Sequence, residues 1–139
     1  MAQPGQSIKG YDFDDVTKRI IGAAIEVHKE LGSGFQEVVY QRALSMELQA
    51  AGIEHSREQD IKIYYKGKHI DTRRVDFILD ECIVEIKARS ELLPQDYVQT
   101  LNYLKSSRYR LALLINFGGQ KIEVKRFVNE RGKYLSFPP

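Results

Sequence analysis

Apolar positions in the first fifty residues recur every three or four places, which is the spacing of one stripe along a helix. A first helix is predicted from Asp14 or Asp15, which would cap it, to Leu31, with Gly32 ending it through a left-handed backbone. A second helix is predicted over residues 36–51, closed by Gly52, so that the chain opens with an αα-hairpin. The predicted stripes are Val16, Ile20, Ala23, Ala24, Val27 and Leu31 in the first helix, and Val39, Ala43 and Met46 beside Tyr40, Leu44 and Leu48 in the second.

From residue 61 the period falls to two, which predicts strands. Apolar and lysine-rich positions alternate over residues 61–66, and two further strands are predicted at residues 69–79 and 82–88, separated by a turn at Asp80 and Glu81. Pro94 suits the first turn of a third helix, predicted to end at Ser106 or Ser107. Its inward residues are predicted to be Val98, Leu101 and Leu104.

The segment "YRLALLINF" is an almost continuous apolar run, typical of a strand covered on both faces. A last amphipathic strand, "KIEVKRFV", follows a glycine-rich turn. The predicted order is therefore α-α-β-β-β-α-β-β, an α+β or mixed α/β fold with a central mixed β-sheet flanked by helices. Residues 1–13 are predicted to be a flexible polar arm and residues 14–139 a single domain.

The net charge of the 139-residue chain is only +2, which does not by itself indicate a nucleic-acid partner. The one cysteine, Cys82, lies in an apolar strand and is expected to be a buried structural thiol in a reducing compartment. No apolar run approaches the ~20 residues of a membrane helix, and the first residues lack the apolar core of a signal peptide. We therefore expect a cytoplasmic protein without a membrane partner.

The segment "RRVDFILDECIVEIKA" places three ionisable residues, Asp76, Glu85 and Lys87, on a predicted β-hairpin. Because strand side chains alternate, Glu85 and Lys87 share a face, and Asp76 can join them from the neighbouring strand. Two converging carboxylates resist joint ionisation unless a cation binds them, and hard oxygen ligands suit Mg²⁺ or Mn²⁺. A solvent-facing hairpin edge with a cross-strand ion pair explains the same pattern.

Three further polar residues are candidates. Glu37 lies in the first turn of the second helix, where the helix dipole alone favours a carboxylate, or where it would reach a metal at the sheet. Gln99 and Tyr103 are four residues apart and share a face of the third helix. That face either points over the sheet toward a phosphate or is ordinary exposed helix surface.

The segment "GFQEVVY", Gly34 to Tyr40, fits the G-x-x-E-x-x-Y signature of the bacterial and archaeal GxxExxY proteins. "AAIEVHKELGSGFQEVVYQRAL" and "INFGGQKIEVKRFV" also resemble that family, and the resemblance spans about residues 14–128. The family is grouped with the PD-(D/E)xK nuclease-like superfamily, whose D…(D/E)-x-K motif resembles Asp76 followed by Glu85-Ile86-Lys87. Val75 stands where many members have proline, at a position that varies. The resemblance implies a restriction-endonuclease-like core.

The resemblance also implies roles for individual residues. Asp76 and Glu85 would bind Mg²⁺ or Mn²⁺ directly, with the carbonyl of Ile86 as a third ligand and Glu37 as a further acidic group. Lys87 would position or activate the attacking water. The remaining implied positions are Gln99 as a catalytic glutamine, and Tyr103 and Arg74 as contacts to the substrate.

Three functions remain open from the sequence. The first is a metal-dependent nuclease acting on DNA or RNA, for which a homodimer would supply the two sites that cutting both strands needs. The second is a nucleic-acid-binding module that does not cut. The third is a protein-interaction module that keeps only the fold, with Tyr64, Tyr97 and Tyr109 as an exposed contact surface.

Overall fold

The computed structural model describes residues 13–129 and confirms the predicted order of helices and strands. The predicted arm at residues 1–13 lies outside the described residues, except that Phe13 begins the first helix. None of the described helices is long and apolar enough to cross a membrane. The elements are α1 (Phe13–Leu31), α2 (Glu37–Ala50), β1 (Ser56–Tyr65), β2 (Lys68–Leu79), β3 (Cys82–Lys87), α3 (Pro94–Ser106), β4 (Leu111–Asn116) and β5 (Glu123–Val128).

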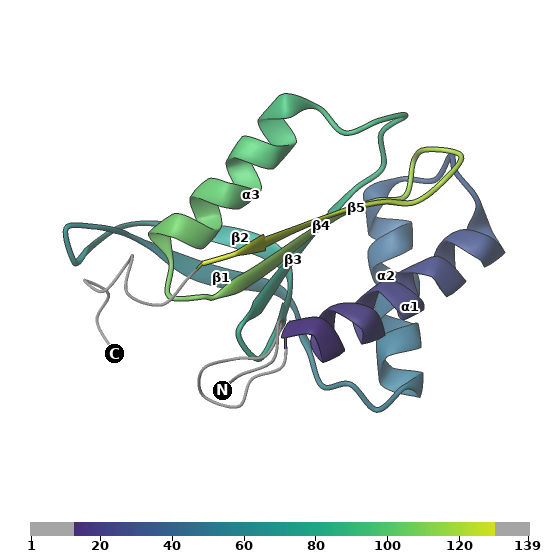
Figure 1. Ribbon diagram of the computed structural model, residues 1–139, viewed down its shortest axis with the longest axis horizontal. Coiled ribbons are helices and arrows are strands. Elements are labelled where there is room, and N and C mark those ends of the chain that lie inside the picture. Colours follow the sequence, from purple (N-terminus) through teal and green to yellow (C-terminus); the bar gives the residue numbers. More distant parts are fainter. Residues whose placement is uncertain (1–12, 130–139) are drawn as a thin grey trace.

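The five strands form one mixed sheet in the order β1-β2-β3-β4-β5. Only β3 and β4 pair in parallel, because α3 carries the chain back across the sheet between them. Helix α3 covers one face, and α1 and α2 cover the other (Figure 1). All six residues of β4 are buried, as the unbroken apolar run predicts for a strand with both faces covered.

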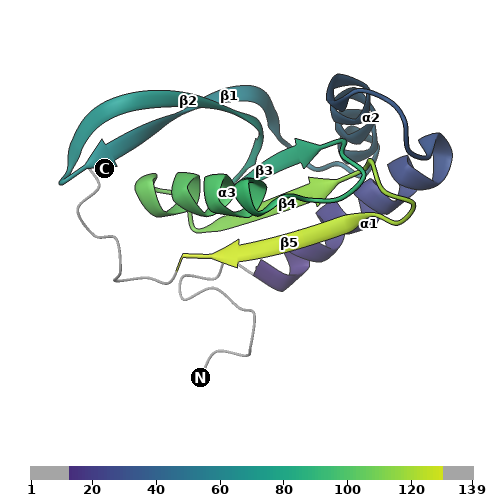
Figure 2. The same cartoon turned by 90° about the horizontal axis from the view of Figure 1, so that it is seen from above.

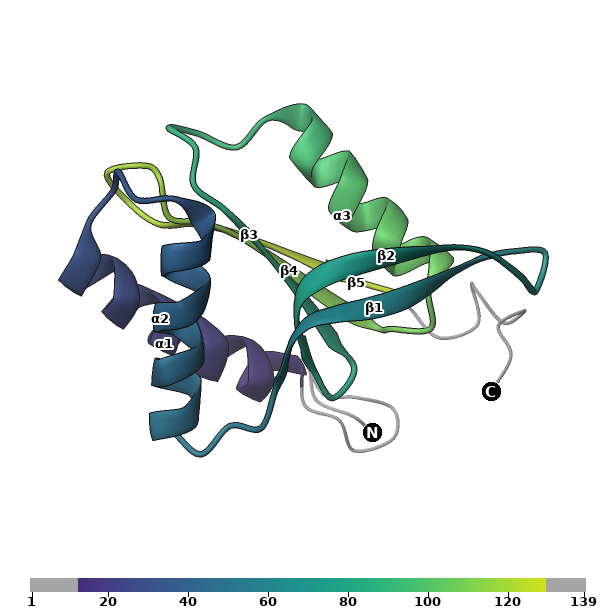
Figure 3. The same cartoon turned by 180° about the vertical axis from the view of Figure 1, so that it is seen from behind.

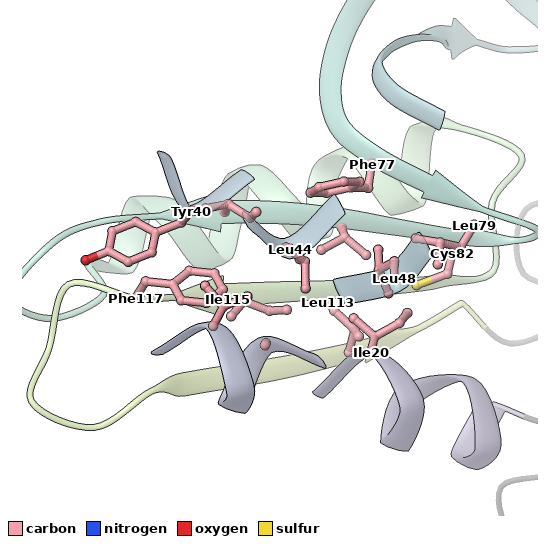
Figure 4. Packing of buried hydrophobic residues seen from close by; sticks show 14 of the residues in the cluster. Ile20, Tyr40, Leu44, Leu48, Phe77, Leu79, Cys82, Leu113, Ile115 and Phe117 are labelled. Atoms are coloured by element: carbon pink, nitrogen blue, oxygen red, sulfur yellow. The ribbon is translucent and has the colours of Figure 1, made fainter. Parts of the chain in front are cut away.

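The larger of two cores lies between the α1–α2 pair and the sheet. The predicted stripe of α1 is confirmed, since Ile20, Ala24 and Val27 are buried there. Figure 4 shows the side chains of this core meeting from α1, α2 and the central strands. At one end the ring of Tyr40 stacks on that of Phe117, with centroids 4.8 Å apart. Cys82 is fully buried in the same core, as predicted, and burial raises the pKa of its thiol.

The smaller core lies under α3 and shows that the predicted inward stripe of this helix was wrong. Its buried members are Ile61, Val75, Ile83, Leu104 and Ala112. On α3 itself Leu104 is buried as predicted, but Val98 and Leu101 are 56% and 38% exposed. Polar residues fill the buried side of the helix instead, namely Asp96 and Thr100.

Three smaller expectations also fail. Helix α1 begins before Asp14 and Asp15, so these residues lie in its first turn and do not precede it as a cap. Met46 is 69% exposed and does not join the stripe of α2. The last is the proposed tyrosine surface, since Tyr64, Tyr97 and Tyr109 are all partly buried.

Strands β1 and β2 form a long hairpin whose tip extends past the end of α3 (Figures 2 and 3). The two strands pair from Ser56↔Ile78 at the base to Tyr65↔Lys68 at the tip, with an irregularity between Ile63 and Tyr64. The base of the hairpin belongs to the sheet, and the rest projects from the body of the domain.

Candidate active site

The candidate site lies where β2 and β3 separate. Their backbone ladder runs from Leu79↔Cys82 to Phe77↔Val84 and stops there, one step before Asp76 and Glu85 would pair. Side chains bridge the strands beyond that point. The backbone N–H of Asp76 donates to Oε1 of Glu85 at 3.0 Å, and the backbone N–H of Ile86 donates to Oδ2 of Asp76 at 2.7 Å. Both carboxylates are therefore held in the gap between the strands.

The backbone around Asp76 is irregular in a way that explains this gap. Val75 packs in the core under α3 and Phe77 in the core under α1 and α2, so the regular alternation of faces breaks at Asp76. On the other side, Glu58 of β1 lies opposite Asp76 and adopts a left-handed backbone with φ of 49°. A non-glycine residue in that region is uncommon and is typical of a bulge or of a functional site.

A polar chain from α2 and β1 supports Asp76 from the far side. Nε2 of Gln41 donates to Oδ1 of Asp76 at 3.0 Å, and Nη2 of Arg57 donates to Oε1 of Gln41 at 2.8 Å. Gln41 is only 5% exposed, so these bonds satisfy a buried amide and fix its orientation. Neither Gln41 nor Arg57 was predicted. The signal available was that Gln41 follows Glu37 by four residues and so shares its helix face.

Burial gives the two carboxylates unusual acidities. Glu85 is 7% exposed, and desolvation together with the nearby charge of Asp76 raises its pKa to about 8. Burial also raises the pKa of Asp76 above its ordinary value, although the bonds from Ile86 and Gln41 oppose that shift. The positive charge of Lys87 acts on both acids and lowers the pKa of each. A solvent-facing hairpin edge is therefore excluded for Glu85.

The charges of two further acids reach this pair. Glu58 raises the pKa of Asp76, and Glu37 raises that of Glu85. Glu37 is exposed at the first turn of α2, within electrostatic range of Glu85, and its role at a metal stays a prediction. Glu58 was not predicted, because the left-handed backbone that it adopts opposite Asp76 has no sequence signature of its own.

The G-x-x-E-x-x-Y segment builds the corner that carries Glu37. Gly34 has a φ of +111°, which L side chains rarely adopt. The hydroxyl of Tyr40 donates to the carbonyl of Gly32 at 2.5 Å and accepts from the N–H of Phe35 at 3.3 Å. The glycine thus permits the turn and the tyrosine ties it down, and Glu37 is held between them at the start of α2.

A cleft of about 680 Å³ lies between α3 and the sheet beside these acids. Of the predicted residues, Lys87, Gln99 and Tyr103 line it, and Nε2 of Gln99 donates to the hydroxyl of Tyr103 at 3.1 Å. Burial and the charge of Glu85 raise the pKa of Tyr103, so this face of α3 lies within electrostatic range of the paired acids. The full lining is Arg73, Lys87, Arg89, Gln95, Asp96, Val98, Gln99, Asn102 and Tyr103.

Arg74 does not line this cleft. Its side chain is exposed and forms an ion pair with Asp60 on β1 at 3.5 Å. Its neighbour Arg73 lines the cleft instead, because adjacent strand residues point to opposite faces. The contact of Arg74 with a substrate phosphate stays a prediction, although Arg73 is the member of this Arg-Arg pair that lies at the cleft.

One buried asparagine fixes the segment that follows Lys87. Asn116 is fully buried, and its Oδ1 accepts from the N–H of Arg89 at 2.9 Å and from that of Gly118 at 3.1 Å. Its Nδ2 donates to the carbonyl of Arg89 at 2.9 Å and to Glu123 at 2.8 Å. Together with the bond from the N–H of Phe117 to the carbonyl of Lys87, these contacts lock the exit of β3.

The donor chemistry at the gap fits a hard divalent cation. Within residues 13–129 no group of three or more His, Cys, Asp or Glu side chains is placed to hold a metal. Two carboxylates and a backbone carbonyl are nevertheless a sufficient protein contribution for Mg²⁺, which keeps several waters and takes further ligands from a phosphate. A cation would also relieve the mutual repulsion of Asp76 and Glu85.

The element order and the paired acids at the end of the β2–β3 hairpin define a restriction-endonuclease-like domain. A family model described as the PD-(D/E)XK nuclease superfamily matches residues 14–127. The chain belongs to the PD-(D/E)XK nuclease superfamily. No curated protein matches the sequence.

Proposed function

We propose that this protein is a metal-dependent nuclease that hydrolyses phosphodiester bonds of nucleic acid. The observation that carries the proposal is the buried pair of Asp76 and Glu85, bridged by the N–H groups of Asp76 and Ile86 and adjoined by Lys87. A structural ion pair needs no second carboxylate in such a place, and burying two is costly without a cation. Members of this superfamily generally use divalent metals, and the donor set suits Mg²⁺ or Mn²⁺.

The residues divide the work as follows. Asp76, Glu85 and the carbonyl of Ile86 would hold the ion, with Glu37 joining through water. When bound, the ion supplies Lewis-acid stabilisation of charge on the phosphate. Lys87 orients the attacking water and balances the negative charge that develops on phosphorus. The last contacts in this proposal come from α3, where Gln99 and Tyr103 hydrogen-bond the phosphate or the lysine.

The experiment compares cleavage of single-stranded DNA, duplex DNA and RNA with Mg²⁺, Mn²⁺ or EDTA. The wild-type protein is expected to cut at least one substrate only with metal, and Asp76→Ala and Lys87→Ala are expected to lose about 100-fold or more in rate. Glu30→Ala and Lys29→Ala are matched controls, since both residues are exposed on α1, on the other face of the sheet. Cleavage that survives in Asp76→Ala would refute the assignment.

A second candidate is a nucleic-acid-binding module that does not cut. The observation that favours it is the absence, within the described residues, of a third side-chain ligand beside Asp76 and Glu85. Salt-sensitive binding without cleavage in any metal would establish this alternative. Isothermal titration of Mn²⁺ into the protein separates the two cases before any substrate is added, because only the nuclease requires a metal site that Asp76→Ala destroys.

Three finer statements belong to the same proposal. The G-x-x-E-x-x-Y corner supports membership of the GxxExxY branch, because Gly34 adopts the positive φ of the turn and Tyr40 hydrogen-bonds the carbonyl of Gly32. A homodimer would bring two sites to a duplex, and sedimentation with and without DNA measures it. A cytoplasmic location is proposed from the single buried thiol of Cys82, which needs no oxidising compartment.

A further inference from the structure

The outer part of the β1–β2 hairpin, residues 62–74, is here named the hairpin arm. Every residue of β2 from Lys68 to Arg74 is exposed, seven in succession. A strand that packs on a core buries every second residue, so neither face of β2 is covered along this stretch. A two-stranded hairpin gains little stability by itself. The stability of the fold therefore does not explain why the hairpin arm projects beyond α3 (Figures 2 and 3).

The hairpin arm concentrates positive charge that the whole chain lacks. It contains five cationic residues and one carboxylate, a net charge of +4, against +2 for all 139 residues. The remainder of the chain is thus net negative by two. The cations are Lys62, Lys66, Lys68, Arg73 and Arg74, and the carboxylate is Asp71.

Three of these cations are available to a partner. Arg73 pairs with Asp71 at 2.9 Å and Arg74 pairs with Asp60 at 3.5 Å. Lys62, Lys66 and Lys68 are exposed and form no ion pair with any residue in the range 13–129. The tip also exposes two apolar side chains, Tyr65 at 60% and Ile70 at 63%.

The hairpin arm leads directly out of the candidate active site. Arg73, at its base, lines the cleft beside Lys87. Lys68 lies five residues further along the strand, which corresponds to about 17 Å at ~3.3 Å per residue. That length equals about five nucleotides at ~3.4 Å per step along one strand. A nucleic acid seated in the cleft and continuing along β2 would place its backbone within reach of Lys66 and Lys68 at the tip, whereas Lys62 pairs with Thr72, next to Arg73, and lies on the other face of the hairpin.

We propose that the hairpin arm is a second nucleic-acid contact, which binds the phosphate backbone of the substrate about five nucleotides from the bond that is cut. This inference rests on the proposed function, which seats the nucleic acid in the cleft and lets it continue from there along the hairpin arm. The charge pattern fits a polyphosphate, since neutralising several phosphates with lysine is the main source of sequence-independent affinity. At the tip the ammonium of Lys66 lies over the exposed ring of Tyr65, 5.3 Å from its centroid, so this pair presents a cation and an aromatic ring together.

The test measures binding separately from cleavage. Fluorescence anisotropy in EDTA, from 50 to 200 mM salt, follows labelled 30-nucleotide and 4-nucleotide probes, the longer one as single-stranded and duplex DNA and RNA. The arm variant carries Lys62→Ala, Lys66→Ala and Lys68→Ala. The control carries Lys18→Ala, Lys29→Ala and Lys121→Ala, which remove equal charge at exposed positions away from the hairpin arm.

For the 30-nucleotide single strand, the arm variant should reduce the slope of log affinity against log salt by about 1.4, since the phosphate contacts of Lys66 and Lys68 contribute ~0.7 each. The control should keep the wild-type slope, and neither variant should change binding of the 4-nucleotide probe. Equal effects of the two triple variants, or binding of the long probe by none of the forms at 50 mM salt, would overturn the proposal. Arm-dependent binding by a protein that cuts nothing would refute the nuclease function and retain the hairpin arm.

Discussion

The pKa of Glu85 predicts that the metal-free protein loses stability as the pH rises. In the unfolded chain Glu85 ionises with a pKa of 4.5, and in the folded protein it keeps its proton up to about 8. Between these values the folded state binds one more proton than the unfolded state. The free energy of unfolding therefore falls by about 1.4 kcal/mol per pH unit, or roughly 5 kcal/mol over the whole window. Stability from this group is complete below pH 4.5 and lost as the pH passes 8.

The variant Glu85→Gln isolates this effect, because the amide keeps an oxygen for the N–H of Asp76 but cannot ionise. At pH 5 its free energy of unfolding should be close to that of the wild type. At pH 8 in EDTA it should be higher by up to about 5 kcal/mol, a large part of the 5–15 kcal/mol typical of a domain. In Glu85→Gln the free energy of unfolding should still fall by a smaller amount as the pH rises above about 4, since the pKa of Asp76 is also raised from 3.8.

Urea unfolding between pH 5 and 9 measures these differences, with the exposed Glu30→Gln as the control. Mn²⁺ at pH 8 should restore stability to the wild type, because the cation favours the ionised pair, and should leave Glu85→Gln unchanged. The reasoning fails if wild-type stability is flat from pH 5 to 8.5, or if Glu85→Gln declines as steeply as the wild type. Either result would mean that Glu85 is ionised and solvated in the folded protein.

Two other predictions concern the residues that hold the site in shape. Asn116→Ala should lower the free energy of unfolding by about 3–4 kcal/mol, because it leaves the peptide groups of Arg89 and other buried partners without hydrogen bonds; an effect below 1 kcal/mol in urea unfolding would contradict the assignment. Tyr40→Phe keeps the stacked ring but loses the bond to Gly32, so it should cost about 1 kcal/mol. It should also reduce cleavage more than Leu48→Val, a core variant of similar cost remote from Glu37; equal losses of activity would show that the corner does not position that glutamate.

The paired acids were predictable because a short hairpin leaves few choices. Once Asp80 and Glu81 form the turn, strand period places Glu85 beside Lys87, and Asp76 follows from the register. The period alone did not reveal that the strands separate there, nor that Gln41 and Arg57 brace Asp76. Those contacts join α2 to β1 and β2, and depend on how a helix packs on a sheet rather than on local sequence.

Helix α3 shows why a functional element misleads a reading based on hydrophobicity. Val98, Leu101 and Leu104 form a plausible stripe, yet the helix buries Asp96 and Thr100, while Gln99 and Tyr103 line the cleft. Asp96 is only 2% exposed, and burying a carboxylate is costly unless it is paired. Arg89 and the N–H of Leu93 bind its carboxylate and offset that cost. A helix that covers a polar cleft must present polar groups inward, so its apolar residues are displaced to solvent. Apolar residues on the outside and satisfied polar residues on the inside are together the signature that distinguishes such a helix from one that only packs.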